Sequence, residues 1–582
     1  MLAIREFVAK SLVEEEVENR TLRSDFPNVP IDERPFGLQF MDALYEHALK
    51  NPMRIAMVGD NRVNADDPTD CVNYEELIRL SHDVEDFLRG INYGKDDVAC
   101  TVMPNCWQFA SIFAGVSLTG GTLSTSPIFT SDEIERQLND CGASVVFCHF
   151  ATLTKTRKAL EKCPKVKTVI VIRKQNSSIE LQKNEIPFEL LSSLIEQRES
   201  RKYERTFVNV HKDSLLLIYS SGTTSLPKGV NVSHFNFSAA TAAYQQACDY
   251  SISVMPTSVL LQIDSNYNAV DDTLLLIPPF YHIYGIFTLV QSLMLGTKCV
   301  VVRQFNGEQF CSLIEKHKIK TQMLVPSLIH FLATSPIVDQ YDLRSLRLLI
   351  SGGAPLSREL AAAVQKRLPS LQFIGQAYGM SELTCISHYP YPSADLEEIV
   401  SVGKLAPNLE LRIVDVKTGL SLSIGEVGEI RIRGPIVMHG YLNNSKETKE
   451  IIDADGFLKT GDVGYVDPNT RLLYVVDRIK ELIKVNGRQV APCELENLLA
   501  AHPLVSDCAV IGVQHQRYGE VPRAFVVTNS TALTESELVE FVGRQVASYK
   551  QLKGGVEFID EIPKTKSGKV LRRELKAFNS KL

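Results

Sequence analysis

The sequence lacks several features that would place it in other common protein classes. It contains no run of about 18 apolar residues, so a membrane-spanning helix is not expected. It has no excess of basic residues: the formal net charge is −7, whereas a nucleic-acid-binding protein usually carries a basic face. None of its 12 cysteines lies in a CxxC pair, so reduced, buried thiols are expected in place of disulfides or a zinc site. The first residues are charged and acidic and do not follow the pattern of a signal peptide.

The length and the order of apolar runs predict an α/β protein of several units. A chain of 582 residues with 44% hydrophobic residues is expected to form two to four structural units with a large core. From about residue 50, short apolar runs alternate with amphipathic stretches, which is typical of layered and largely parallel sheets. The runs predicted to be buried strands are 145–150, 168–174, 215–220, 274–278, 299–305 and 346–353, and a predicted helix covers 358–368.

Two changes in the sequence pattern predict domain boundaries. From about residue 408, apolar and polar residues alternate between turn signals, as in a smaller antiparallel barrel or sheet. After Asp477, about 100 residues mix strand and helix patterns, which is enough for a small α+β domain. We therefore predict an N-terminal domain over residues 1–476, with its β-rich part at about 408–476, and a C-terminal domain over residues 477–582.

A glycine- and hydroxyl-rich stretch, YSSGTTSLPKGV at 219–230, follows one of the apolar runs. Such a loop after a strand commonly binds phosphate, because its backbone N–H groups form an anion-binding concavity and a lysine adds positive charge. It is not the Walker P-loop, since six positions separate Gly222 from Lys228 and no Ser or Thr follows the lysine directly. A plain surface turn is the alternative. The phosphate-binding residues predicted here are Ser220, Ser221, Gly222, Thr223, Thr224 and Lys228.

Further candidate residues follow strands or lie in turns. His282 in PPFYHIYG follows a strand end, where α/β active sites usually lie, although a lone histidine is more often a satisfied core residue. Glu382, next to Ser381 in GQAYGMSE, has the chemistry of a Mg²⁺ ligand or of a charge at a helix N-terminus. Asp462 in TGDVGYVD can accept ribose hydroxyls or form an ordinary turn. Lys569 in KSGKVLRR, taken alone, is an ordinary surface lysine.

Taken together and in sequence order, these motifs become recognisable. YSSGTTSLPKG, PPFYHIYG, SGGAPLS, GQAYGMSE, TGDVGY, DRIKELIKVNG and PKTKSGKVLRREL resemble the core motifs of the acyl-adenylate-forming superfamily over about residues 35–575. HIYG and DRIKELIK are most similar to its 4-coumarate–CoA ligase and luciferase branch. The resemblance implies a large N-terminal domain of layered α/β sheets with a small β-barrel-like subdomain, and a small mobile α+β C-terminal domain.

The resemblance also implies a two-step reaction. A small-molecule carboxylic acid attacks the α-phosphate of MgATP, which releases pyrophosphate and forms an acyl-AMP. A thiol, usually that of CoA, then displaces AMP. ATP, Mg²⁺ and CoA are therefore the implied cofactor and co-substrates of an AMP-forming acid–CoA ligase. Because phosphoryl chemistry depends mostly on positioning and charge stabilisation, cationic and hydroxyl side chains suit this reaction.

Site roles follow from the match to the family's motifs. Lys569 matches the catalytic lysine that bridges the acyl oxygen and the α-phosphate, and Glu382 matches the magnesium ligand; His282 completes the implied catalytic set. The implied ATP-binding residues are Ser220, Ser221, Gly222, Thr223, Thr224, Lys228, Gly353, Gln376, Tyr378, Ser381, Asp462 and Arg478. The implied acyl pocket contains His282, Tyr284 and Gly353. The C-terminal domain is implied to alternate between two poses, with Lys480 in the hinge and with Lys484 and Gly487 serving thioester formation.

Several positions depart from the family pattern. Ser225 and Ala377 stand where glycine is usual, and Gln304 and Asn486 stand where the plant ligases have lysines that contact CoA; Arg303 is adjacent. The expected acid is hydrophobic, either aromatic or medium-chain, because Tyr284 and the aliphatic residues of 321–332 are among the implied pocket walls. A luciferase-like oxygenase and a non-catalytic nucleotide-binding homologue remain alternatives. Loading of a carrier protein is disfavoured, since PPFYHIYG lacks an acidic residue to hold an amino group.

The last three residues, Ser580-Lys581-Leu582, match the peroxisomal address SKL. A chance tripeptide on a polar tail is the alternative reading. We expect a peroxisomal protein that binds the import receptor through this tripeptide, and no nucleic-acid partner.

Overall fold

The computed structural model describes residues 20–59, 70–126, 130–172, 180–191, 206–220, 227–253, 269–391, 393, 395–485, 488–528, 530–565 and 570–580. Within these residues, each apolar run predicted to be a buried strand overlaps one, and residues 358–367 form the expected helix. The layered, largely parallel sheets confirm the predicted α/β class. In this part of the chain, every helix is too short or too polar to cross a bilayer.

The largest sheet lies in the N-terminal domain and runs β20-β10-β9-β5-β4-β6-β7-β8. Its strands from β9 to β8 pair in parallel, and β10 turns back antiparallel to β9, so that Lys228 lies opposite Ser220. The strands are buried on both faces, which explains their near-continuous apolar sequence. Their bounds are β4 Val98–Val102, β5 Thr122–Thr125, β6 Val145–His149, β7 Thr168–Ile172, β8 Glu185–Pro187, β9 Ser214–Ser220, β10 Lys228–Ser233 and β20 Gly440–Tyr441.

Two smaller sheets complete the layered core. One runs β11-β12-β2-β3, and the other runs β13-β14-β15 with all its strands parallel. A short antiparallel pair, β16 and β17, follows them in the chain. Their bounds are β2 Ile55–Val58, β3 Cys71–Asn73, β11 Thr273–Leu276, β12 Lys298–Val301, β13 Thr321–Leu324, β14 Leu348–Ser351, β15 Phe373–Gln376, β16 His388–Tyr389 and β17 Lys404–Leu405.

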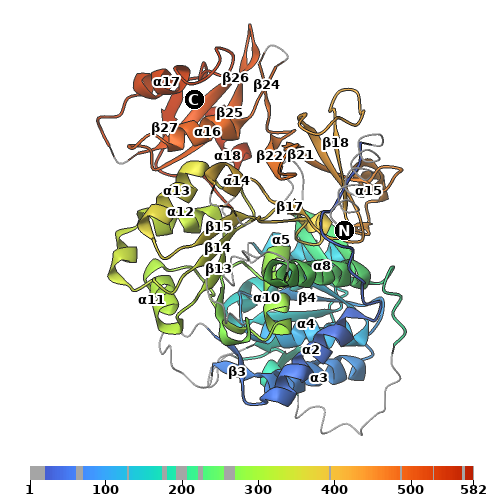
Figure 1. Cartoon of the computed structure of the whole chain (residues 1–582). Helices are drawn as coiled ribbons and strands as arrows, with labels where there is room; N and C mark the ends of the chain where they lie inside the picture. The colour runs from blue at the N-terminus through green and yellow to red at the C-terminus, as the bar shows by residue number, and fades with distance from the viewer. Residues whose placement is uncertain are drawn as a thin grey trace, which may run out of the picture.

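The β-rich part and the C-terminal part each have a sheet of their own. The first runs β1-β18-β19-β21-β22 and is antiparallel, and the second joins β24, β23, β26, β25 and β27. Figure 1 shows the C-terminal sheet at the opposite end of the molecule from α2 and α3. The bounds are β1 Leu22–Arg23, β18 Glu410–Val414, β19 Gly428–Arg433, β21 Leu458–Val466, β22 Leu473–Arg478, β23 Ile483–Val485, β24 Arg488–Val490, β25 Asp507–His515, β26 Gly519–Val527 and β27 Val556–Phe558.

Several helices begin where a polar side chain accepts a hydrogen bond from one of their first N–H groups. Thr130 and Glu133 form a capping box at α5, and Thr534 and Glu537 do the same at α17. The bounds are α2 Phe36–Lys50, α3 Tyr74–Gly90, α4 Gln108–Thr119, α5 Ser131–Cys141, α6 Leu153–Leu160, α8 His234–Ser253, α10 Ile283–Met294, α11 Gly307–His317, α12 Pro326–Thr334, α13 Arg358–Arg367, α14 Leu396–Ile399, α15 Ser445–Ile451, α16 Pro492–Ala500, α17 Glu535–Gly543 and α18 Arg572–Asn579.

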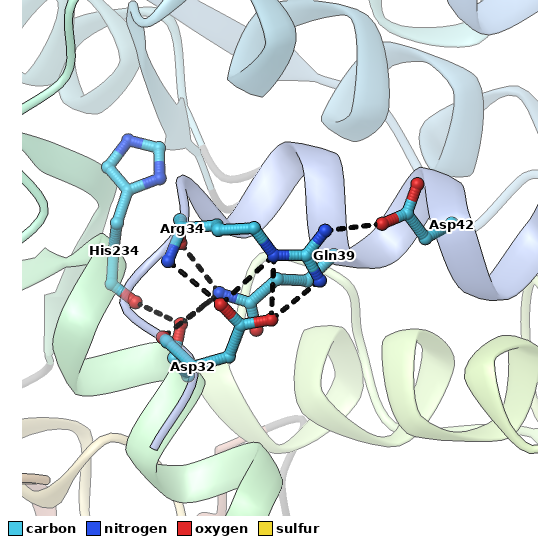
Figure 2. Close-up of polar contacts among 6 residues, drawn as sticks. Asp32, Arg34, Gln39, Asp42 and His234 are labelled. Carbon is cyan, nitrogen blue, oxygen red and sulfur yellow. Dashed lines mark hydrogen bonds and ion pairs between the residues drawn. The ribbon is translucent and has the colours of Figure 1, made fainter.

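Polar contacts fix the segment that leads into α2 (Figure 2). Arg34 lies between two carboxylates and makes ion pairs of 2.6 Å with both Asp32 and Asp42. The N–H of Phe36 donates to Nδ1 of His234, at the start of α8, over 3.1 Å. Behind this contact the rings of Phe36 and Phe237 pack 4.7 Å apart. The entry to the first described helix is thereby joined to a helix about 200 residues later in the chain.

Three buried histidines predict that the protein loses stability in mild acid. Burial lowers the pKa of His149 and His388 to about 3 and that of His234 to about 4. Because these values lie below the unfolded value near 6.5, the unfolded chain binds more protons as the pH falls from about 6.5 to about 4. Each histidine therefore removes up to about 1.4 kcal/mol of stability per pH unit over this range.

Thermal unfolding measured between pH 7 and pH 5 tests this expectation. The unfolding temperature is expected to fall with pH, and to fall less steeply in His234→Asn, whose amide oxygen can replace Nδ1 as acceptor for Phe36 N–H. An unfolding temperature that does not change over this range would contradict the effect of the buried histidines.

Candidate active site

Tyr378, Asp462 and Arg478 form a hydrogen-bonded cluster at the edge of the β-rich sheet. Strands β21 and β22 place Asp462 opposite Arg478, and their side chains form an ion pair with Nε 3.0 Å from Oδ1. Oη of Tyr378 donates to Oδ2 of Asp462 over 2.6 Å. Burial and the Asp462 carboxylate raise the pKa of Tyr378 well above its usual value, so the phenol keeps its proton. Burial opposes the charge on Arg478, but Asp462 and Glu481 outweigh it and raise the pKa of Arg478.

The turns after β14 and β15 lie next to each other because the two strands are parallel neighbours. Gly353 has a φ of 84°, a left-handed conformation that side chains rarely adopt, which explains the glycine here. Oε1 of Gln376 accepts from Leu356 N–H over 2.6 Å, and its Nε2 donates to the carbonyl of Val400 over 2.9 Å. The Gln376 side chain thus fixes the turn that carries Gly353.

The segment after β15 folds back sharply and presents Glu382. Gly379 comes so close to the Cys385 carbonyl that an added Cβ would lie 1.7 Å from the oxygen. Thr384 and Cys385 have φ values of 47° and 89°, an uncommon conformation for residues with side chains. Ser381 and Glu382 are both buried within this tight loop. Oη of Tyr441 donates to Oε1 of Glu382 over 2.8 Å.

Lys228 begins β10 and has two neighbours from much later in the chain. Its ammonium forms an ion pair with Glu447 on α15, and its Nζ lies 5.3 Å from the centroid of the Tyr441 ring. Tyr441 therefore contacts both Lys228, through its ring, and Glu382, through its hydroxyl. The structure brings a cation of the predicted phosphate loop to the same tyrosine as the predicted magnesium ligand.

His282 and Tyr284 stand at the N-terminus of α10. Nδ1 of His282 accepts from Tyr284 N–H over 3.2 Å and so caps the helix. The Tyr284 ring passes within 3.3 Å of the point where a Cβ on Gly352 would lie, so any side chain at that position would press against the ring. Asn105 supports the preceding turn, because its side chain accepts from Phe280 N–H over 2.8 Å and donates to the Pro278 carbonyl over 3.1 Å.

Contacts between β22 and α16 join the β-rich sheet to the C-terminal part. Oδ2 of Asp477 accepts from Cys493 N–H over 3.1 Å, and burial raises the pKa of Asp477 to about 6. Lys480 and Lys484 are both exposed beyond this contact. Figure 1 places α18 and the C-terminal sheet on the side of α12 to α14.

Charged groups beside the predicted catalytic lysine lie near the N-terminal domain. Lys564 pairs with Val570 across an isolated bridge and forms a 2.6 Å ion pair with Asp507. Burial lowers the pKa of His330, on α12 directly after β13, and Asp507 and Lys564 also act on it electrostatically. Lys564, just before the segment 566–569, therefore lies close enough to α12 of the N-terminal domain to influence His330.

The model of the AMP-binding enzyme family matches residues 44–442, and that of the AMP-binding enzyme C-terminal domain matches residues 494–569.

The chain belongs to the AMP-binding enzyme family.

Named relatives of this AMP-binding enzyme extend over nearly its full length. A probable 4-coumarate–CoA ligase 1 of Dictyostelium discoideum is 36% identical over 573 residues, covering 96% of this chain and 97% of the relative. A 4-coumarate–CoA ligase of Pinus taeda is 35% identical over 541 residues, covering 90% and 93%. The resemblance to the acyl-adenylate-forming superfamily and the predicted class, an ATP-dependent and AMP-forming acid–CoA ligase, are confirmed.

Solved structures share the fold at lower identity. An anthranilate–CoA ligase in complex with anthranoyl-AMP has a TM-score of 0.78 at 21% identity, over 96% of this chain and 99% of that one. A MatB protein of Rhodopseudomonas palustris with bound ATP has a TM-score of 0.76 at 23% identity, over 93% and 98%. The predicted fold class, a large layered domain with a small C-terminal one, is confirmed by these structures.

The AMP-binding enzyme's predicted site residues divide into four groups. The structure places three in direct contact: Tyr378, Asp462 and Arg478. It places others at the ends of strands or in the turns that follow them: Lys228, His282, Tyr284, Gly353, Gln376, Ser381 and Glu382. Lys480 and Lys484 are exposed and follow β22 in the chain. The remaining predicted residues lie outside the described residues, or have side chains that do: Ser220, Ser221, Gly222, Thr223, Thr224, Gly487 and Lys569.

Sequence reasoning missed Tyr441, Glu447 and Asn105. The first two lie in YLNNSKE, whose asparagine-rich turn between β20 and α15 could have drawn attention, although nothing local indicates contacts with Lys228 and Glu382. Asn105 follows β4 at the carboxyl edge of the sheet, a position that favours functional side chains.

Proposed function

We propose that this acid–CoA ligase activates a hydrophobic carboxylic acid, either aromatic or medium-chain. The observation that supports the proposal is the wall made by Tyr284, whose ring lies against Gly352 and whose helix α10 is largely buried and mostly apolar. A pocket bounded by an aromatic ring and aliphatic side chains favours apolar acids, because each buried methylene contributes about 0.8 kcal/mol. The 4-coumarate–CoA ligase relatives are consistent with an aromatic acid.

The acid class is tested by acyl-CoA formation with MgATP and CoA across a panel of acids. We expect kcat/KM for octanoate or a cinnamate-type acid to exceed that for acetate by at least about 100-fold, since acetate leaves the apolar wall unfilled. Comparable values for acetate and for the larger acids would contradict the proposed pocket. Exchange of CoA for cysteamine, a thiol without the nucleotide, separates acid selection from CoA binding.

For magnesium, the donor set fits a site that Glu382 shares with the substrate. Among the described residues, no group of three or more histidine, cysteine, aspartate or glutamate side chains could hold a metal by itself. Mg²⁺ is commonly bound by one or two carboxylates together with substrate phosphates and water, and the buried Glu382 carboxylate is such a ligand. When bound, the ion would offset the negative charge of the triphosphate as the acid approaches.

Within this proposal, the chain's own residues orient the nucleotide. Asp462, held by Tyr378 and Arg478, would accept the ribose hydroxyls, and Gln376 fixes the turn whose Gly353 backbone would face the base. Lys228 and the hydroxyl-rich loop before it would bind pyrophosphate. Lys569 would place its ammonium between the acyl oxygen and the α-phosphate, and rotation at Lys480 would then bring Lys484 and Gly487 to the site for the thioester step.

We also propose a peroxisomal location, based on Ser580-Lys581-Leu582. A fluorescent protein that carries the last residues of this chain is expected to enter peroxisomes. The same fusion without the last three residues is expected to stay outside, and import of both would overturn the proposal.

A further inference from the structure

The ammonium of Lys228 already has an anionic partner within the chain. The Glu447 carboxylate forms an ion pair with it, and the exposed fractions of the two side chains are 22% and 31%. Because both groups are mostly shielded from water, the pair is screened less by salt than a pair at the open surface. The pair joins β10 to α15 through two residues that are 219 positions apart in the chain.

Glu447 is held in place by contacts other than the one to Lys228. Asn444 caps α15: Glu447 N–H donates to Oδ1 of Asn444 over 3.1 Å, and Nδ2 of Asn444 donates back to Oε2 of Glu447 over 2.9 Å. Lys228 binds the other oxygen, Oε1. One carboxylate oxygen is therefore fixed by the helix itself, and the second is presented to the lysine.

Tyr441 ties this pair to the rest of the site. Its ring lies beneath the ammonium of Lys228, and its hydroxyl donates to Glu382. Burial, together with the carboxylates of Glu382 and Glu447, raises the pKa of Tyr441, which keeps the hydroxyl protonated as a donor. Glu447 is therefore connected, through Lys228 and Tyr441, to the predicted magnesium ligand Glu382, in the region assigned to the polyphosphate.

A carboxylate in contact with a phosphate-binding lysine competes with the phosphate for the same ammonium. A polyphosphate that engages this ammonium does so at the expense of its contact with Glu447, and departure of pyrophosphate lets the full ion pair form again. The competition lowers the affinity of the site for ATP and for pyrophosphate. It does not affect AMP, which has no β- or γ-phosphate to contact Lys228.

We propose that Glu447 acts as an intramolecular competitor for Lys228 that promotes release of pyrophosphate. The inference rests on the proposed role of Lys228 in binding the polyphosphate. Glu447 does not touch the reacting atoms and is a positioning residue that acts through Lys228.

The test measures inhibition by magnesium pyrophosphate and, separately, by AMP in the full-length enzyme. In Glu447→Gln, we expect the inhibition constant of pyrophosphate to fall roughly three- to fivefold, the size expected for loss of a partly exposed ion pair. The inhibition constant of AMP is expected to stay unchanged, and KM for ATP to fall. Glu450→Gln removes the same charge from an exposed position on the same helix and is expected to alter neither constant.

A double-variant cycle with Lys228→Ala separates this inference from the proposed function. If Lys228 binds polyphosphate, Lys228→Ala weakens pyrophosphate inhibition, and adding Glu447→Gln to it has no further effect. Unchanged inhibition in Lys228→Ala overturns the role of the lysine. The competition is overturned if Lys228→Ala weakens pyrophosphate inhibition but Glu447→Gln fails to tighten it. It is also overturned if Glu447→Gln tightens pyrophosphate inhibition equally with and without Lys228. If Glu447→Gln changes the inhibition constant of AMP and the unfolding temperature in parallel, Glu447 has a merely structural role, and the proposed competition is overturned too.

Discussion

Replacing Lys569 by alanine is expected to slow acyl-adenylate formation by about two to three orders of magnitude, the usual cost of losing a charge that stabilises a transition state. The acid carboxylate approaches an anionic triphosphate, and the ammonium offsets charge on both the acyl oxygen and the α-phosphate. Thioester formation from supplied acyl-AMP and CoA is expected to stay within about threefold of wild type, since the proposal assigns that step to the face carrying Lys484 and Gly487.

The two half-reactions are measured separately in single-turnover experiments. Acyl-AMP formation is followed without CoA, and acyl-CoA formation is started from synthetic acyl-AMP. Lys566→Ala, which removes the same charge three positions earlier, serves as the matched control and is expected to retain both steps. Equal losses of both half-reactions in Lys569→Ala would contradict the two-pose account.

Replacing Asp462 by asparagine is expected to lower kcat/KM for ATP by about 10- to 100-fold. The variant keeps the shape of the side chain but removes the charge that pairs with Arg478 at 3.0 Å and accepts the 2.6 Å bond from Tyr378. Hydrogen bonds to a charged group contribute about 1.5–3 kcal/mol each, which sets the size of the loss. Tyr378→Phe removes only the donor to Asp462 and is expected to cost less.

Deoxynucleotides show whether the loss arises at the ribose. If Asp462 accepts the ribose hydroxyls, 2′-deoxy- and 3′-deoxy-ATP are poor substrates for the wild-type enzyme, but Asp462→Asn uses them about as well as it uses ATP. If the penalty for the missing hydroxyl is the same in both proteins, Asp462 supports the fold at this point and does not contact the sugar.

Strands and helices with a clear apolar period could be predicted from the sequence, but their distant partners could not. The runs at 145–150 and 168–174 are buried on both faces, so their composition identifies them without knowledge of their neighbours. By contrast, β1 pairs Leu22 with Leu411, and β20 pairs Tyr441 with Val230. Two-residue strands carry no readable period, and nothing local specifies a partner several hundred positions away.

In the site, too, residues that lie in family motifs could be predicted, but contacts between residues distant in the chain could not. Asp462 and Arg478 could be predicted to act together, because each lies in a motif of the family and β21 pairs directly with β22. The contact of Lys228 with Glu447 could not be predicted, because it depends on where α15 packs in the fold, more than 200 residues after β10. The role of Gln376 also depends on context, since its amide is engaged by Leu356 and Val400.

The most direct test of the central claim is acid-dependent release of pyrophosphate and AMP by the purified enzyme with MgATP, with and without CoA. We expect pyrophosphate release to require a hydrophobic carboxylic acid, and turnover to AMP to accelerate strongly when CoA is added, with one acyl-CoA formed per AMP. Pyrophosphate release that CoA does not accelerate, or ATP binding without acid-dependent release across the panel, would contradict assignment of this chain as an acid–CoA ligase.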